Sequence, residues 1–183
     1  SVQGILKSYN ESKWGYFEYL LDLTTLISRI ETTPLEYWKA RIDTNLIKKL
    51  DMKEINCMAT NCLLKKSFMK KLGGFNEEME TNEDRDLAAR IIRNNGKIVF
   101  SSSLETKHIY NFSVINIISR KWRHGTGGAI IRKIYPDIYP DNIINGIKHI
   151  LSFINPPKQF RSFEGRIYFF IQSIVFETSL VFH

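Results

Sequence analysis

The spacing of apolar and polar residues predicts strands and helices in the first half of the chain. Residues 2–6 read as a strand, and residues 16–30 place apolar side chains at helical intervals. Residues 55–64 read as a buried strand that enters a helix over residues 65–72. Gly73-Gly74 is expected to end that helix, because glycine adopts at little cost the backbone conformations that stop a helix.

The clearest predicted helix covers residues 82–95. Gly96 follows it in the position favoured for a left-handed cap. Residues 97–101 then read as a short strand, and residues 106–110 as a second one. This part of the chain therefore predicts a helix that returns directly into a sheet.

The second half of the chain is predicted to be rich in helices. Residues 113–124 read as a helix that is apolar early and basic late, and we expect the glycines of residues 125–128 to break or bend it. Residues 142–154 predict a further helix, and residues 167–182 are strongly apolar. This last segment is shorter than the roughly 20 residues that cross a bilayer and contains a glutamine and a glutamate, so we expect it to lie on a surface.

Composition narrows the class of protein and of partner. A chain of 183 residues suits one domain with a real core. The net charge of +7 favours an anionic partner, such as a nucleotide diphosphate, an acidic membrane surface or nucleic acid. The two cysteines, Cys57 and Cys62, have no second pair, which argues against a zinc site or a disulfide framework and favours a reducing compartment.

Three carboxylates, Glu83, Asp84 and Asp86, fall in the first turn of the clearest helix. One interpretation is structural: acidic side chains there complement the helix dipole, and Thr81 and Asp84 have the spacing of a capping box. The other interpretation is catalytic, because a helix start holds a carboxylate rigidly where it can take a proton from a hydroxyl. The residues alone leave both interpretations open.

Two further groups carry candidate chemistry. His108 follows the second short strand, as either a hydrogen-bonded surface residue or a metal ligand. The segment Arg120-Lys121-Trp122-Arg123 is either a solvated helix end or a phosphate-binding cluster, since a guanidinium group pairs with phosphate oxygens at two points. The lysines of residues 65–71 are typical of a solvated helix face.

The order of motifs between residues 57 and 128 resembles the acceptor-side half of the family 2 nucleotide-sugar glycosyltransferases. The shared elements are the turn Gly73-Gly74-Phe75-Asn76-Glu77, the helix start Asn82-Glu83-Asp84-Arg85-Asp86-Leu87, the strand bounded by Gly96, and a histidine after that strand. The family usually has aspartate where this chain has Asn76. The substitution keeps turn chemistry and removes a charge.

The resemblance implies an α/β fold that forms the C-terminal portion of a GT-A domain and is helix-rich after residue 113. Residues 1–130 would form the acceptor-side half, and residues 131–183 a helical extension. The implied reaction is inverting transfer of a sugar from a nucleotide-diphosphate sugar to an acceptor hydroxyl. The implied site comprises Asp84 as the catalytic base, Glu83, Asp86, Asn61 and Trp122 as acceptor-binding residues, Arg120 and Arg123 as donor phosphate-binding residues, and His108 as a metal ligand.

The family places its nucleotide-binding half, with a metal-binding Asp-x-Asp, before this region. Because the Asp-x-Asp of this chain, Asp84 to Asp86, belongs to the acceptor-side helix, we expect the chain to be a fragment that binds uridine or guanosine diphosphate sugars weakly. A divalent metal, Mg²⁺ or Mn²⁺, would be bound mainly by residues outside the chain. The fragment itself is expected to be inactive.

The expected partners are a nucleotide-diphosphate sugar, a sugar or lipid-linked acceptor and a membrane surface contacted by the C-terminal helix, with no nucleic acid. The expected location is cytoplasmic and peripheral on the inner face of the membrane. The alternative is a non-catalytic basic module that docks on an anionic membrane or on nucleic acid. That module would use residues 65–71, residues 120–123 and the apolar C-terminus.

Overall fold

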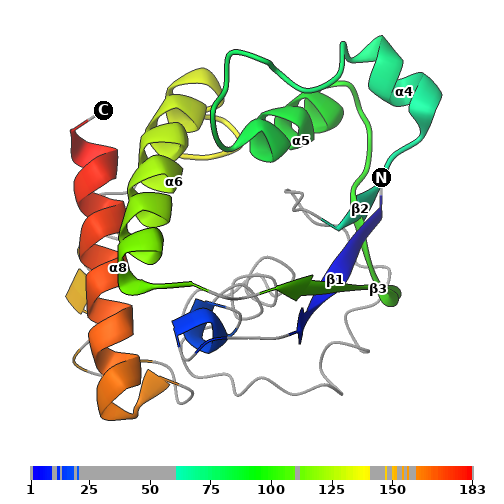
Figure 1. Cartoon of the computed structure of the whole chain (residues 1–183). Coiled ribbons are helices and arrows are strands. Elements are labelled where there is room, and N and C mark those ends of the chain that lie inside the picture. Colours follow the sequence, from blue (N-terminus) through cyan, green and yellow to red (C-terminus); the bar gives the residue numbers. More distant parts are fainter. Residues whose placement is uncertain are drawn as a thin grey trace.

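The computed structural model describes residues 2–9, 12, 14–18, 20, 61–109, 112–140 and 160–182, with single positions at 147, 150, 151, 154 and 156. In that part of the chain the strands are β1 (Val2–Tyr9), β2 (Cys62–Leu63) and β3 (Val99–Ile109). The helices are α4 (Lys66–Lys71), α5 (Glu83–Arg93), α6 (Val114–Ile134) and α8 (Phe163–Val181). Residues 14–18 and 20 are also helical. Figure 1 shows α6 and α8 on one side of the molecule and the strands on the other.

The described strands form one mixed sheet in the order β2-β1-β3. β1 is antiparallel to β2, with Gln3 opposite Cys62, and parallel to β3, with Gln3 opposite Phe100. Ile5 already pairs with Glu105, so β3 bulges between these two points. The expectation of two separate strands over residues 97–101 and 106–110 was therefore wrong, because they are one strand interrupted by this bulge.

The helices α6 and α8 lie side by side and run in the same direction (Figure 1). Ile117 shares a core cluster with Phe169, while Gly125, further along α6, faces Ser179, further along α8. A Cβ at Gly125 would lie 1.5 Å from Ser179 Oγ, so only glycine allows this close approach. The expected break at residues 125–128 was wrong, because the glycines stay helical where neighbouring segments approach α6 closely.

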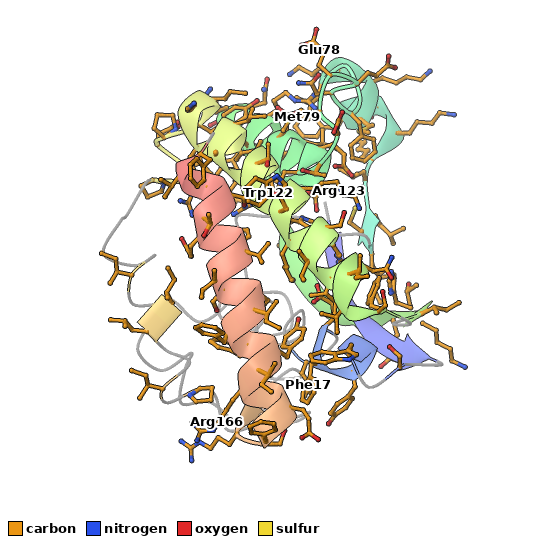
Figure 2. All side chains as sticks on the ribbon, turned by 60° about the vertical axis from the view of Figure 1, so that its left-hand side comes forward. Phe17, Glu78, Met79, Trp122, Arg123 and Arg166 are labelled. Atoms are coloured by element: carbon orange, nitrogen blue, oxygen red, sulfur yellow. The ribbon has the colours of Figure 1, made fainter. Side chains whose placement is uncertain are left out.

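Two hydrophobic clusters of described residues lie toward opposite ends of α6. The first cluster comprises Phe17, Leu20, Ile117, Phe160, Tyr168 and Phe169. The second cluster comprises Ala89, Ile131, Tyr135 and Tyr139, with Met79 packed against it. Figure 2 places Phe17 and Met79 toward the two ends of this helix. Since α6 contributes Ile117 and Ile131, one continuous helix joins the two cores.

The glycines that follow α4 and α5 differ in their roles. Gly73 and Gly74 do adopt positive φ after α4, as expected. At the end of α5, however, Asn95 has the left-handed backbone, with φ of 56°, and Gly96 does not. Gly96 is needed for space instead, because a Cβ there would lie 2.7 Å from Ile91 Cγ2.

Several predicted elements lie partly outside the described residues. The helices predicted over residues 16–30 and 142–154 lie mostly outside them, with helical backbone at 16–18, 20, 147, 150 and 151. The predicted strand over residues 55–64 is described only at its end, as β2, where Leu63 is exposed. α6 crosses residue 130 without interruption, so the expected boundary between 130 and 131 falls inside a helix. Of the described helices, none combines the length and hydrophobicity that a membrane span requires.

Candidate functional site

The predicted base, Asp84, lies in the first turn of α5. Glu83 beside it is exposed, and Asp84 is half-buried. The carboxylate Oδ1 of Asp84 accepts a hydrogen bond from the backbone N–H of Arg85 at 2.8 Å. Burial and the negative charge of Asp84 together raise the pKa of the Cys62 thiol, which indicates that this carboxylate lies close to β2. The first turn of α5 thus places the charge of Asp84 within electrostatic reach of Cys62 in β2.

The two residues before α5 are bound to α6. Thr81 Oγ1 donates to the carbonyl of Arg123 at 2.9 Å, and Asn82 Nδ2 donates to the carbonyl of His124 at 3.1 Å. Asn82 is buried and has a left-handed backbone, with φ of 63°. Its side chain makes no cap to α5, so the expected capping box of Thr81 and Asp84 was wrong, because Thr81 bonds to α6 instead.

Gly127 makes this docking of the Thr81–Asn82 segment on α6 sterically possible. A Cβ at Gly127 would lie 2.3 Å from Thr81 Oγ1 and 2.5 Å from Asn82 Nδ2. The structure therefore brings together two motifs that are about forty positions apart in the chain, the acidic helix start and the basic, glycine-rich segment.

Trp122 and Arg123 lie on the turn of α6 to which Thr81 and Asn82 are bound. Figure 2 shows both on this helix, away from the first core cluster around Phe17. Both side chains are exposed, and Trp122 retains 41% of its surface. An exposed indole and an exposed guanidinium are suited to stacking on a sugar ring and pairing with a phosphate.

Asp86, predicted to bind the acceptor, lies in a buried network. Its Oδ2 accepts two hydrogen bonds from Arg90, at 2.9 and 2.6 Å, and its Oδ1 accepts one from Tyr135 at 2.6 Å. Burial and the hydrogen bond to Asp86 raise the pKa of Tyr135 to about 12. Arg90 also donates to the carbonyl of Leu72 at 2.6 Å. These contacts tie α5 to the turn after α4 and to the end of α6.

An open depression of about 460 Å³ lies over this network. It is lined by Gly73, Phe75, Asn76, Glu77, Asp86, Arg90 and Tyr135. Asp84 does not line it, because two positions along a helix separate side chains by about 200° around the axis. The structure thus separates two residues that the resemblance assigns to one site.

Arg120, predicted to bind donor phosphate, faces a buried carboxylate. Its Nε lies 3.7 Å from Glu18 Oε1 and donates to His124 Nε2 at 3.3 Å. Lys121 Nζ donates to the same Glu18 oxygen at 2.6 Å, and the Tyr168 hydroxyl donates to the other. Burial alone would raise the pKa of Glu18, but the charges of Lys121 and Arg120 and these hydrogen bonds lower it below its ordinary value.

The remaining predicted site residues lie in or beside the sheet. Asn61 is buried and donates to the carbonyl of Leu104 at 3.0 Å, so it links the residue before β2 to the bulged part of β3. His108 is half-buried on β3, in register with Ser8 of β1. Within the described ranges, His, Cys, Asp and Glu side chains do not gather in a group of three that could hold a metal ion. These residues do not by themselves fit a metal centre, and His108 stays a prediction.

Sequence reasoning missed the buried charged cluster around Glu18. It did not predict that Lys121 pairs with Glu18 or that His124 lies beside them. Glu18 and Lys121 are 103 positions apart, and no local pattern signals such a pair.

Comparison with protein-family models, curated proteins and solved structures finds no match to this chain. Function is therefore inferred from the residues and their arrangement.

Proposed function

We propose that this chain contributes the acceptor-side half of an inverting glycosyltransferase. The observation that supports the proposal best is the docking of the Thr81–Asn82 segment on α6. It fixes the acidic start of α5 to the turn of α6 that carries Trp122 and Arg123. A positioned carboxylate, an aromatic surface and a phosphate-pairing cation are the groups that transfer from a nucleotide-diphosphate sugar requires.

In this proposal Asp84 is the general base. The acceptor hydroxyl gives its proton to the Asp84 carboxylate while its oxygen forms a bond to the anomeric carbon of the donor. The bond between that carbon and the diphosphate breaks with inversion, and the diphosphate leaves with the bonding electrons. The rigid first turn of α5, fixed to α6 through Thr81 and Asn82, keeps the carboxylate in place for this proton transfer.

The other predicted residues divide into two groups. Glu83 and Trp122, which are exposed, are proposed to bind the acceptor, and Arg123 to pair with the donor diphosphate. Asn61, Asp86 and Arg120 make contacts within the chain that hold β3, α5 and α6 in place. We derive no step through Mg²⁺ or Mn²⁺, because the described residues do not fit a metal centre by themselves.

The proposed partners are a nucleotide-diphosphate sugar and a sugar or lipid-linked acceptor. The basic composition, with a net charge of +7, supports an anionic donor. A cytoplasmic location, peripheral on the inner face of a membrane, completes the proposal. Contact with the membrane through the C-terminal helix is the expectation that follows from its apolar sequence.

The test is Asp84→Asn in the complete enzyme, with a donor-binding half joined to this chain, assayed with a panel of uridine and guanosine diphosphate sugars for release of the nucleoside diphosphate. We expect a rate lower by roughly 10²-fold or more, the scale of a lost general base, with the melting temperature nearly unchanged. Glu83→Gln is the matched control and should lower the rate less. A normal rate for Asp84→Asn, or no transfer from any donor by the unaltered complete enzyme, would overturn the proposal.

A further inference from the structure

The outer face of α6 carries exposed apolar side chains toward both ends of the helix, with the polar side chains of Thr126 and Lys133 among them. We use this name for Ile115, Ile118, Trp122, Ile130 and Ile134, which are 79%, 39%, 41%, 43% and 44% exposed. The first three follow at intervals of three and four residues, the spacing of one helix face. An exposed apolar surface of this length needs a partner, because its contact with water is unfavourable.

The opposite side of α6 has the reverse character. Toward the interior, α6 presents Gly125, Gly127 and Gly128 to α8 and to the Thr81–Asn82 segment, and Lys121 to Glu18. α6 thus meets its neighbours through small residues and one lysine, and its exposed Ile and Trp side chains lie on the other side of the helix.

The charges on α6 all have the same sign. Between residues 114 and 134 the helix carries Arg120, Lys121, Arg123, Arg132 and Lys133, and it contains no aspartate or glutamate. Arg123 and Lys133 are exposed beside the outer face. A helix face on which Trp and Ile alternate with Arg and Lys matches the boundary between anionic headgroups and acyl chains.

We propose that the outer face of α6 docks on an anionic bilayer surface. The apolar side chains would enter the headgroup boundary, and Arg123 and Lys133 would approach lipid phosphates. The charge of α6 decides between the helices. The outward side of α8 is also apolar, with Phe163 and Val181 exposed at 77% and 84%, but α8 carries Glu164 and Glu177 against one arginine, Arg166. The proposal thus places on α6 the membrane contact that the apolar sequence predicts for α8.

Docking of this face also defines the acceptor, a step that rests on the proposed function. Trp122 belongs both to the outer face and to the proposed acceptor site. An acceptor that reaches Trp122 from a docked surface would come from the bilayer, which favours a lipid-linked sugar over a free one.

The test measures flotation of the full chain with vesicles of phosphatidylcholine alone, or with about a third of phosphatidylglycerol. We expect binding only to the anionic vesicles, lost in about 1 M salt, where the Debye length is about 3 Å. Lys133→Gln should weaken binding about fivefold, the effect of one cation near an anionic surface. Ile115→Ser should weaken it by a similar factor or more.

Each variant has a matched control elsewhere in the structure. Lys70→Gln removes a lysine from the last turn of α4, and Val181→Ser removes an exposed branched side chain from α8. Neither should alter flotation. The proposal would be overturned if Val181→Ser weakened flotation as much as Ile115→Ser, or if the chain bound to neutral vesicles. It would also be overturned if the chain did not float with any vesicles, or if sedimentation showed that it self-associates through the outer face. None of these measurements depends on sugar transfer, so its failure and that of the proposed function are distinguishable.

Discussion

Glu18 and His124 are the residues at which charge and burial interact most strongly. Glu18 is fully buried and touches Lys121, Arg120 and Tyr168. Burial of an ion pair costs free energy because both charges lose their contact with water. Removal of one partner then leaves the other charge buried without compensation. This cluster fixes α6 to the helical residues 14–18 and to α8, so its loss acts on three segments at once.

We predict that Glu18→Gln lowers the free energy of unfolding by about 3–5 kcal/mol, because Lys121 would keep its charge in a buried position. Chemical denaturation followed by circular dichroism measures this. Glu78→Gln, at an exposed position, should change it by less than about 0.5 kcal/mol. The double variant Glu18→Gln with Lys121→Met should be less destabilised than the sum of the single changes. Simple additivity would contradict the coupling.

We predict that His124 makes the free energy of unfolding depend on pH above the range in which carboxylates titrate. Burial, with the charges of Lys121 and Arg120, lowers its pKa from 6.5 to about 4. As the pH falls below 6.5 the unfolded chain binds a proton at His124 that the folded chain does not, so folding loses stability between pH 6.5 and about 4. The loss is on the order of 3 kcal/mol. His124→Gln should flatten this part of the profile. An unchanged slope would refute the assignment.

Glu18 contributes in a lower range of pH. Its folded pKa lies below the ordinary value of 4.5, so its stabilisation is present above 4.5 and is lost as the pH falls through the folded pKa. The two contributions therefore occupy successive windows of one acid denaturation profile.

Among the elements, α5 shows what sequence patterns predict well. Its apolar spacing and its acidic first turn are local properties, and the observed helix, Glu83–Arg93, lies within the predicted range. The predicted caps of α5 were wrong because they depend on neighbouring segments. Thr81 bonds to α6, and Gly96 allows close packing against Ile91.

The glycines of α6 show why other features could not be predicted. Each glycine in a helix interior costs roughly 1 kcal/mol relative to alanine, so residues 125–128 indicated a break. Contacts with α8 and the Thr81–Asn82 segment outweigh that cost, and these contacts join positions 42 or more apart. The sequence likewise placed Asp84, Trp122 and Arg123 in one site only through the family resemblance.

The two neighbouring glycines of α6 allow a matched experiment. We predict that Gly127→Ala lowers stability by about 1–3 kcal/mol, because the new Cβ displaces the segment that precedes α5. At Gly128 the nearest atom to a new Cβ is Leu180 Cδ2 at 3.2 Å, the end of a flexible side chain. Gly128→Ala should therefore be neutral or should stabilise the chain by up to about 1 kcal/mol, the helix propensity that alanine adds. Thermal melts compare the two, and equal stabilities would contradict the steric role of Gly127.

At the scale of the whole molecule, the question is whether the chain unfolds as one unit. The first core cluster stacks Phe160 on Tyr168, with ring centroids 5.9 Å apart, and the second cluster packs Ile131 against α5. A boundary at residue 130 would let the segments on its two sides melt separately. The uninterrupted α6 between the clusters argues that they melt together.

We predict that Phe160→Ala and Ile131→Ala each destabilise both ends of the molecule. Truncation of a fully buried Phe or Ile costs about 2–5 kcal/mol, and α6 transmits the loss because it belongs to both clusters. Hydrogen exchange of the amides of α5 and α8 measures this, and each variant should accelerate the slowest amides of both helices by the same factor. If Phe160→Ala accelerated α8 alone, the two clusters would unfold independently, and the division near residue 130 would hold in spite of the continuous helix.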